Sequence, residues 1–322
     1  MFDIKDVEDN LNSEMLHYFR GERDGYVQVG EKKWFLPVKY KKLAEAYKNF
    51  EVRSDDVWII GYPRSGTSLT EELTWLLTHN LDYEGVKDYR AQFFENNLVL
   101  NEKTVKEIIE KFPNEEDIIQ KKKNSLELLR NEKKRRVIKT HLPFELLPED
   151  VFKKGCKIIY ICRYPKDVAV SYFFLQSSIR HIDFCGDLSK FWQYFRNGNT
   201  MFGPYFDHVE QGFKRIGSKN FLFIFYEEFR KNMSAFIRKL TEFLEITLSE
   251  EDLTKLKNYM DFENYRKKEI NVKDKDNNPV NFCRKGVVGG WKEHFSEIIN
   301  EEAESWIKMN AERIGIKYPE MK

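Results

Sequence analysis

The chain has 322 residues and a formal net charge of +1, and 41% of its residues are hydrophobic and 33% are charged. That length can bury a large core, either as one α/β domain or as two smaller ones. A balanced charge gives no global field that would attract nucleic acid or an anionic membrane, so we expect neither as a partner. The four cysteines (Cys156, Cys162, Cys185 and Cys283) form no C-x-x-C pair, which is typical of free thiols in a reducing compartment.

The start of the chain, Met1–Asp6, mixes charges and has no apolar segment that could target or anchor it, so we expect a cytoplasmic protein. Strand-like apolar runs alternate with helical patterns over the whole length. This alternation predicts one α/β domain over residues 1–322, with a P-loop-like fold and a central parallel sheet that has helices on both faces. The expected strands are Val57–Ile60, Val137–Lys139, Ile158–Cys162 and Phe221–Phe225, and the expected helices include Thr104–Lys111, Val168–Ser178 and Met233–Leu244.

The first functional segment is Trp58–Ser68, where an apolar run enters a helical pattern through a glycine loop. Unpaired N–H groups and the helix dipole make such a helix start a phosphate site. Gly61 and Gly66 match the G-x-x-x-x-G spacing of a Walker A loop. Thr67 stands where that motif requires lysine, and the cation of this loop is Arg64 instead. We therefore expect the loop to hold a 5′-phosphate while a group other than a γ-phosphate is transferred, although such a loop is also a common turn.

Val137–Pro143 is a short β-branched run that ends in Lys139, Thr140 and His141. The carboxyl ends of parallel strands line the ligand crevice, and alternation predicts that Lys139 and His141 project to the same side. A lysine for developing negative charge beside a histidine that takes a proton is a plausible transfer pair. A histidine at a strand end is nevertheless more often structural than catalytic.

Two further segments carry cations near glycine or proline. Lys157–Ser171 is a buried-type strand that ends at Arg163, followed by a helix that Pro165 begins, and both Arg163 and Ser171 could reach one phosphate. Asn281–Trp291 is a glycine-rich loop with the sequence Arg-Lys-Gly. Taken singly, these are also compatible with a surface arginine, an ordinary helical serine and a solvated basic loop.

Together and in this order, the four segments resemble the cytosolic sulfotransferase family over about residues 34–301. Its members carry a 5′-phosphosulfate loop, here Tyr62–Ser68, and a Lys-Thr-His catalytic segment, here Lys139–His141. The resemblance implies the donor 3′-phosphoadenosine-5′-phosphosulfate (PAPS), the product 3′-phosphoadenosine 5′-phosphate (PAP), and transfer of a sulfuryl group to a hydroxyl. The chain resembles the insect branch of the family, which includes an enzyme that dehydrates retinol, and that activity is the alternative.

The resemblance also implies a role for each site residue. His141 is the general base, for which an unperturbed pKa of about 6.5 would suit neutral pH, and Lys139 and Arg64 neutralise the leaving charge. The implied nucleotide ligands are Arg64, Ser65, Gly66, Thr67, Ser68, Leu69, Arg163, Ser171, Tyr226, Phe262, Cys283, Arg284, Lys285 and Gly286. Tyr226 and Phe262 match the adenine-side aromatics, and Leu69 stands where many members have tryptophan. Five cations make a divalent metal unnecessary, namely Arg64, Lys139, Arg163, Arg284 and Lys285, and the sequence shows no cluster with metal-ligand spacing.

Two other classes of function remain open from the sequence. A nucleoside triphosphatase or kinase would need the missing Walker lysine and an acidic residue at the end of a strand. The only candidate for that acidic residue is Glu227. A non-catalytic nucleotide-binding protein could dispense with His141, so the intact Lys139–His141 pair argues against it. The acceptor is expected to be a small, apolar hydroxyl compound that the sequence does not identify.

Three regions lie outside these motifs. The interval 81–136 is expected to be a helical insertion that could form a lid over the acceptor site. The basic runs Lys121–Lys123 and Lys133–Arg136 are expected to be solvated helix faces. Many family members dimerise through a Lys, Thr-Val, Glu segment, and Ser296-Glu297 replaces Thr-Val here. A carboxylate facing its own copy opposes association, so we expect a monomer or a weak homodimer.

Overall fold

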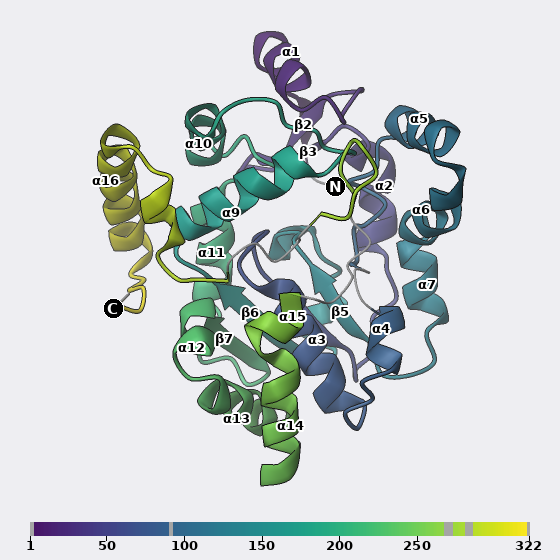
Figure 1. The fold of residues 1–322 in the computed structure, drawn as a ribbon, viewed down its shortest axis with the longest axis vertical. Helices are drawn as coiled ribbons and strands as arrows, with labels where there is room; N and C mark the ends of the chain where they lie inside the picture. Colours follow the sequence, from purple (N-terminus) through teal and green to yellow (C-terminus); the bar gives the residue numbers. More distant parts are fainter. Residues whose placement is uncertain (1–2, 90–92, 267–272, 281–285, 321–322) are drawn as a thin grey trace.

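A central sheet of four parallel strands organises the computed structural model, which describes residues 3–89, 93–266, 273–280 and 286–320. The strand order is β5-β4-β6-β7 (Figure 1). The strands are β4 (Val57–Ile60), β5 (Val137–Thr140), β6 (Lys157–Cys162) and β7 (Phe221–Phe225). All four expected strands are confirmed, with β5 and β6 each one residue longer than expected.

Helices cover both faces of this sheet because alternate strand residues point to opposite sides. Val57 and Ile59 pack with one layer of helices, and Trp58 and Ile60 pack with the other. The first layer contains α3 (Thr67–Thr78), α12 (Tyr226–Lys231), α13 (Met233–Leu244) and α14 (Glu250–Met260). The second contains α2 (Tyr40–Lys48), α9 (Pro165–Ser178), α10 (Leu188–Arg196), α11 (Tyr205–Phe213) and α16 (Glu297–Ile314).

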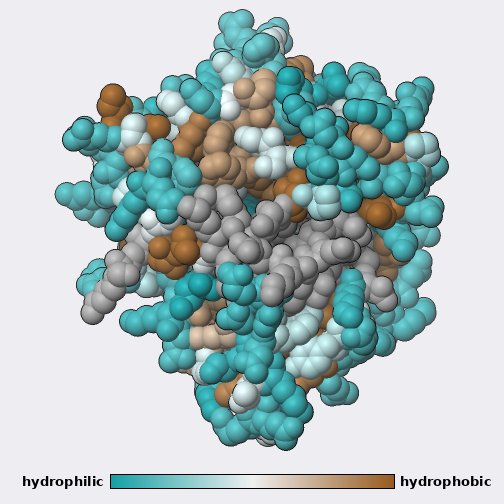
Figure 2. Space-filling view, in the orientation of Figure 1, coloured by the Kyte–Doolittle hydropathy of each residue, from teal (hydrophilic) through white to brown (hydrophobic). Residues whose placement is uncertain are grey.

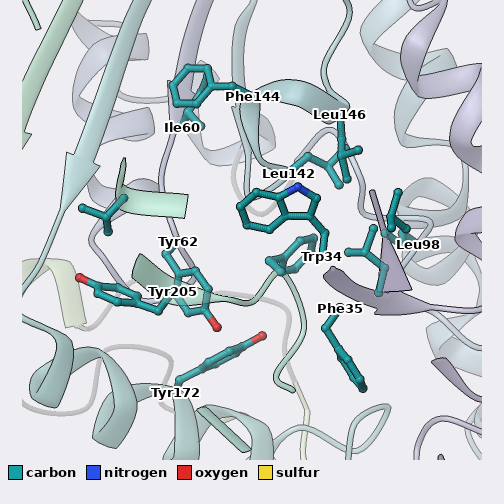
Figure 3. Close-up of a cluster of buried hydrophobic side chains, with 14 of the residues drawn as sticks. Trp34, Phe35, Ile60, Tyr62, Leu98, Leu142, Phe144, Leu146, Tyr172 and Tyr205 are labelled. Atoms are coloured by element: carbon teal, nitrogen blue, oxygen red, sulfur yellow. The ribbon is translucent and has the colours of Figure 1, made fainter. Parts of the chain in front are cut away.

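A small antiparallel sheet near the N-terminus extends the second layer, and the sequence analysis did not predict it. Its strands are β1 (Ile4–Asp6), β2 (Tyr26–Val29) and β3 (Trp34–Pro37), in the order β1-β2-β3. Trp34 and Phe35 of β3 are fully buried and join one cluster with Leu142, which follows β5, and Tyr172 of α9 (Figure 3). The N-terminal segment is therefore part of the main core.

The described residues of the interval 81–136 form short helices joined by turns. Its elements are α4 (Gly85–Tyr89), α5 (Glu102–Lys111), the 3-10 turn η1 (Pro113–Glu115), α6 (Glu116–Lys123) and α7 (Ser125–Asn131). The expectation of solvated basic faces is wrong at Arg136, which precedes β5, is 1% exposed and forms an ion pair with Asp56. Lys122 of α6 is half-buried and lines a cavity.

The remaining short elements are α1 (Asp9–Tyr18), α8 (Asp150–Lys153), α15 (Phe262–Arg266) and the 3-10 turns η2 (Phe144–Leu146) and η3 (Gly290–Glu293). Hydrophilic residues dominate the outer part of the face shown in Figure 2, and several hydrophobic residues gather toward its middle. Within the described residues, no helix is both long and apolar enough to cross a membrane.

Candidate active site

The loop between β4 and α3 has the backbone shape of a phosphate cradle. Gly66 has a φ of +107°, and a Cβ atom built on it would lie 2.7 Å from Cδ2 of Tyr226. Only glycine tolerates both the conformation and the contact. Ser65 is buried, and its hydroxyl has no hydrogen-bond partner among the described residues. An unpartnered buried donor beside the free N–H groups of a helix start fits an anion.

Two arginines meet beside this cradle. Arg64, in the left-handed region with a φ of 71°, donates from Nε to the Ser171 hydroxyl at 2.9 Å. Arg163, at the end of β6, donates to the Arg64 carbonyl oxygen at 3.2 Å and stacks 4.5 Å above the ring centre of Tyr226. Its Nε is buried and lacks a partner within the described ranges. Loop, strand end and α9 therefore present one cationic surface to a ligand.

The described part of the glycine-rich loop near the C-terminus, residues 286–291, is called the late loop here. Helix α9 holds it beside the two arginines. Asp167, in the first turn of α9, accepts the backbone N–H groups of Gly289 at 2.7 Å and Trp291 at 3.1 Å. The hydroxyl of Tyr226 donates to the carbonyl oxygen of Gly286 at 3.4 Å. The end of the Arg-Lys-Gly segment thus lies against the residues that follow β6 and β7.

Lys139 of β5 lies between the cradle and a buried carboxylate. Its Nζ is 3.1 Å from the hydroxyl of Ser68 and 2.9 Å from Oε2 of Glu71 on α3. Both side chains of the ion pair are at most 5% exposed. Burial raises the pKa of the Glu71 carboxyl to about 7, against the lowering effect of Lys139. The carboxyl therefore changes charge near neutral pH.

The ring of His141 is held in one tautomer. Its Nδ1 lies 2.7 Å from the carbonyl oxygen of Gly61, and a carbonyl can only accept, so Nδ1 carries the proton. Nε2 of the neutral ring is then left with its lone pair. The backbone of His141 is fixed as well, because its N–H donates to Glu95 at 2.6 Å and its carbonyl oxygen accepts from Nε2 of His208 at 3.0 Å.

The expectation of an unperturbed imidazole is wrong. Burial lowers the pKa of His141 to about 3, and the nearby Lys139, His208 and Arg64 lower it further. The hydrogen bond to the Gly61 carbonyl opposes these effects. His141 is consequently neutral throughout the physiological range, with Nε2 unprotonated.

A cavity of about 240 Å³ connects these groups with an apolar chamber. His141, Lys139 and Arg64 line it together with Phe93, Met201, Phe202, Tyr172 and Leu175. Phe93 and Phe202 flank the His141 ring, with ring centres 5.8 and 5.6 Å from it. A polar, cationic end and an apolar chamber are what a charged donor and an apolar acceptor would need.

Comparison with known proteins identifies this arrangement. The model of the sulfotransferase domain matches residues 54–315. The chain belongs to the sulfotransferase family. It is 30% identical to the luciferin sulfotransferase of Photinus pyralis over 298 residues, which is 88% of this chain and 79% of that protein. Two crystal structures of retinol dehydratase, with PAP and either androsterone or retinol, cover 99% of both chains, with TM-scores of 0.88 and 0.89 and identities of 27% and 26%.

In this sulfotransferase, one cavity collects most of the residues predicted from the motifs. Arg64, Gly66, Thr67, Ser68, Leu69, Lys139, His141, Arg163, Ser171, Tyr226 and Gly286 all line it, and Ser65 lies buried in the loop beneath it. Cys283, Arg284, Lys285 and the side chain of Phe262 lie outside the described residues. No group of three or more His, Cys, Asp or Glu side chains forms a metal-binding cluster in the part of the enzyme that the structure describes.

Sequence reasoning missed three residues that support this site. Glu71 pairs with Lys139, Glu95 accepts from the His141 backbone and the Thr140 hydroxyl, and His208 donates to the His141 carbonyl oxygen. A signal existed for Glu71, since two adjacent glutamates interrupt an otherwise apolar helical pattern. Glu95 and His208 are distant in sequence and carry no local motif.

Proposed function

We propose that this enzyme transfers the sulfuryl group of PAPS to a hydroxyl of a small apolar acceptor, with His141 as the general base. One observation carries the proposal. The Nδ1–H of His141 donates to the Gly61 carbonyl oxygen, so the available lone pair of the neutral ring is on Nε2. Lys139 lines the same cavity as this ring. PAP is named with the retinol dehydratase structures, which supports the donor class.

In this reaction, Nε2 of His141 takes the proton of the acceptor hydroxyl as its oxygen bonds to sulfur. The bond between sulfur and the bridging phosphate oxygen breaks, and PAP leaves with the negative charge. Lys139 and Arg64 neutralise that charge at the edge of the cradle. The transfer is an in-line displacement, in which the protein contributes mainly position and electrostatic stabilisation.

The polar groups of the site divide between two phosphates. We assign Ser65, Gly66, Thr67 and Ser68 to the 5′-phosphate, because they form the loop and the first turn of α3. Arg163 and Ser171, with the late loop that Asp167 holds, are assigned to the 3′-phosphate. Tyr226 and Leu69, which also line the cavity, are assigned to the adenosine side.

The insertion is assigned to the acceptor side. Val99 and Leu100, together with Lys122 of α6, line the chamber. Phe94, by contrast, is fully buried and packs on Trp58 at a ring-centre distance of 5.3 Å, so it belongs to the core. We therefore assign to the described part of residues 81–136 a covering role at the acceptor chamber as well as a role in the core.

Calorimetry without magnesium tests the nucleotide assignment. PAP is expected to bind far better than 5′-AMP or ATP, because only PAP offers a 3′-phosphate to Arg163. Arg163→Ala should weaken PAP binding by roughly 1.5–3 kcal/mol, the usual scale for a hydrogen bond to a charged group, and should weaken 5′-AMP binding clearly less. Equal affinity for PAP and 5′-AMP would overturn the assignment.

Dehydration of an alcohol is the second candidate, because the retinol dehydratase structures match 99% of this chain. An assay with PAPS and retinol separates the two outcomes. A sulfotransferase that stops after transfer accumulates the sulfate ester, whereas a dehydratase expels that sulfate and yields an anhydro product. Chromatography of the retinoid product distinguishes them directly.

A further inference from the structure

The acceptor chamber has a second polar end, remote from the reacting groups. A small cavity of about 20 Å³ adjoins it and shares Val99, Gln176, His181, Ile182 and Met201 with it. None of the cradle residues, Lys139 or His141 lines that small cavity. The shared residues therefore mark the end of the chamber that lies away from the phosphates.

The residues of helix α9 that line the chamber show that it extends along this helix, away from the phosphates. Ser171 lies at the cationic end, and Gln176 and Ile179 line the chamber further along the helix and just beyond its end. At 1.5 Å of rise per residue, Ser171 and the helix end at Ser178 are separated by about 10 Å. A ligand that fills the chamber from His141 to His181 is consequently elongated.

The distal end carries polar groups that the proposed transfer does not use. His181, on the segment after α9, lines both the chamber and the small cavity. Lys122 of α6 also lines the chamber, close enough for its charge to act on the His181 ring. Burial lowers the pKa of His181 to about 3, assisted by the charges of Lys122 and Arg180, so its ring is neutral. Burial also lowers the pKa of Lys122 to about 8, so the ammonium form still dominates at neutral pH.

Three separate segments fix this end in place. Arg180 forms a buried ion pair with Glu115 of η1 at 3.0 Å, and its Nη1 donates to Asn277 at 2.7 Å. The N-terminal segment adds a backbone hydrogen bond from Gly21 to the Ile182 carbonyl oxygen at 2.9 Å. Gln176 is 2% exposed and bonds to the hydroxyl of Tyr172. Polar groups held in place in an apolar chamber have the character of a specificity site, because they discriminate between ligands that do and do not offer them a hydrogen-bond acceptor.

We propose that Lys122 and His181 form a distal subsite that selects acceptors with a carbonyl or carboxylate oxygen at the end opposite the reacting hydroxyl. The ammonium of Lys122 donates to that oxygen, and the neutral ring of His181 donates a second hydrogen bond. This rests on the proposed function, since it names the acceptor class for the same site.

Matched ligand pairs test the subsite. Binding to the enzyme–PAP complex is measured for a hydroxysteroid with a ketone at the far end and for its deoxo analogue. A second set compares ω-hydroxy carboxylates with alkanols of the same chain length. We expect the oxygen-bearing member of at least one pair to bind about tenfold or more tightly, the scale of a hydrogen bond to a charged group. The two sets separate a ketone from a carboxylate.

Two variants test whether Lys122 and His181 cause the preference for the oxygen-bearing ligand. Lys122→Met and His181→Leu should remove the preference while leaving the affinity for the deoxo or alkanol member within about twofold. Lys123→Met is the matched control, because Lys123 pairs with Glu102 at 2.8 Å and does not line the chamber. It should keep the preference of the unmodified enzyme.

Equal affinities within every pair, including failure of all compounds to bind, would overturn the subsite. The same result follows if both variants weaken both members of a pair equally. PAP binding is measured first in every preparation. Loss of PAP binding by the unmodified enzyme would refute the proposed function, whereas intact PAP binding without discrimination would refute the subsite alone.

Discussion

Glu71 and Lys139 form an ion pair at the point where the proposed donor would place its charge. Oε2 of Glu71 lies 2.9 Å from Nζ of Lys139, and the same Nζ is 3.1 Å from Ser68 in the cradle. Oε1 of Glu71 is buried with no partner among the described residues. The lysine is therefore shared between the protein's own carboxylate and an incoming anion.

This sharing predicts that PAP binding weakens as pH rises. The pKa of Glu71 is raised to about 7, so the carboxyl is largely neutral below that pH and largely ionised above it. Ionised Glu71 repels an anion and competes for Lys139; Glu72 on the same helix adds to the repulsion, and Lys139 on β5 opposes it. Affinity should fall several-fold between about pH 6 and pH 8, measured by calorimetry.

Glu71→Gln should flatten that dependence, because the amide keeps the shape and does not titrate. Glu72→Gln is the matched control, since Glu72 accepts from the Tyr259 hydroxyl at 2.8 Å rather than from Lys139. It should preserve the slope. If Glu71→Gln retains the full slope, another group controls the binding of the anion.

His141→Ala should lower the transfer rate by ~10²–10⁴-fold, the usual cost of removing a general base. PAP affinity should hardly change, since His141 is not assigned to a phosphate. Arg64→Lys should retain activity, because it keeps the cation beside the cradle. Transfer is measured as PAP release with a hydroxyl acceptor. A His141→Ala variant with unchanged rates would remove the proposed mechanism.

The pH profile gives a separate check on His141. Its pKa is lowered to about 3, so the base form is complete well below neutral pH. We therefore expect kcat/KM, which reports the free enzyme, to show no decline near pH 6.5 as pH falls from 8 to 6. An acid limb with an apparent pKa near 6.5 that is absent from His141→Ala would show that the ring is not desolvated as the structure indicates.

The site residues at the strand ends were predictable from sequence, whereas the residues that hydrogen-bond to them and hold them in place were not. Lys139, His141 and Arg163 each follow an apolar run, and the edge rule for parallel sheets brings such residues together without any knowledge of the full fold. Glu95 and His208 fix the His141 backbone from an insertion and from α11, and no spacing rule connects residues so far apart. The N-terminal sheet was missed for a related reason, because Trp34 and Phe35 find their partners in other segments.

Arg136 shows that the composition of a segment alone does not predict whether a charged residue is buried. It closes a run of four basic residues that resembles a solvated face. The pairing of Val57 with Val137 brings the preceding residues, Asp56 and Arg136, side by side at the start of the sheet. The Arg136 guanidinium then donates to both Asp56 oxygens, at 2.7 and 2.6 Å. Strand register, which the sequence does not encode locally, decides the environment of this residue.

Asp56→Ala should destabilise the fold by about 3–5 kcal/mol, because it leaves the Arg136 charge buried without its partner. Urea unfolding followed by tryptophan fluorescence measures the loss. Lys153→Ala is the control: Lys153 and Glu149 form an exposed pair, and its removal should change the free energy of unfolding little. Comparable effects of the two variants would mean that Arg136 is solvated.

The dimer prediction depends on Glu297, which the structure describes as the exposed first residue of α16. Ser296 caps this helix by accepting from the Ile299 N–H at 3.3 Å, and an acidic residue in the first turn is favourable to the helix dipole. The next residue, Ile298, is 72% exposed, so an apolar contact is available if the charge is removed.

We expect a monomer or weak dimer by light scattering, and stronger association for Glu297→Val, because two carboxylates no longer face each other across a symmetric contact. Glu312→Val, exposed on the same helix but outside the Lys, Thr-Val, Glu segment, is the matched control and should leave the mass unchanged. A tight dimer of the unmodified enzyme that Glu297→Val dissociates would contradict the argument.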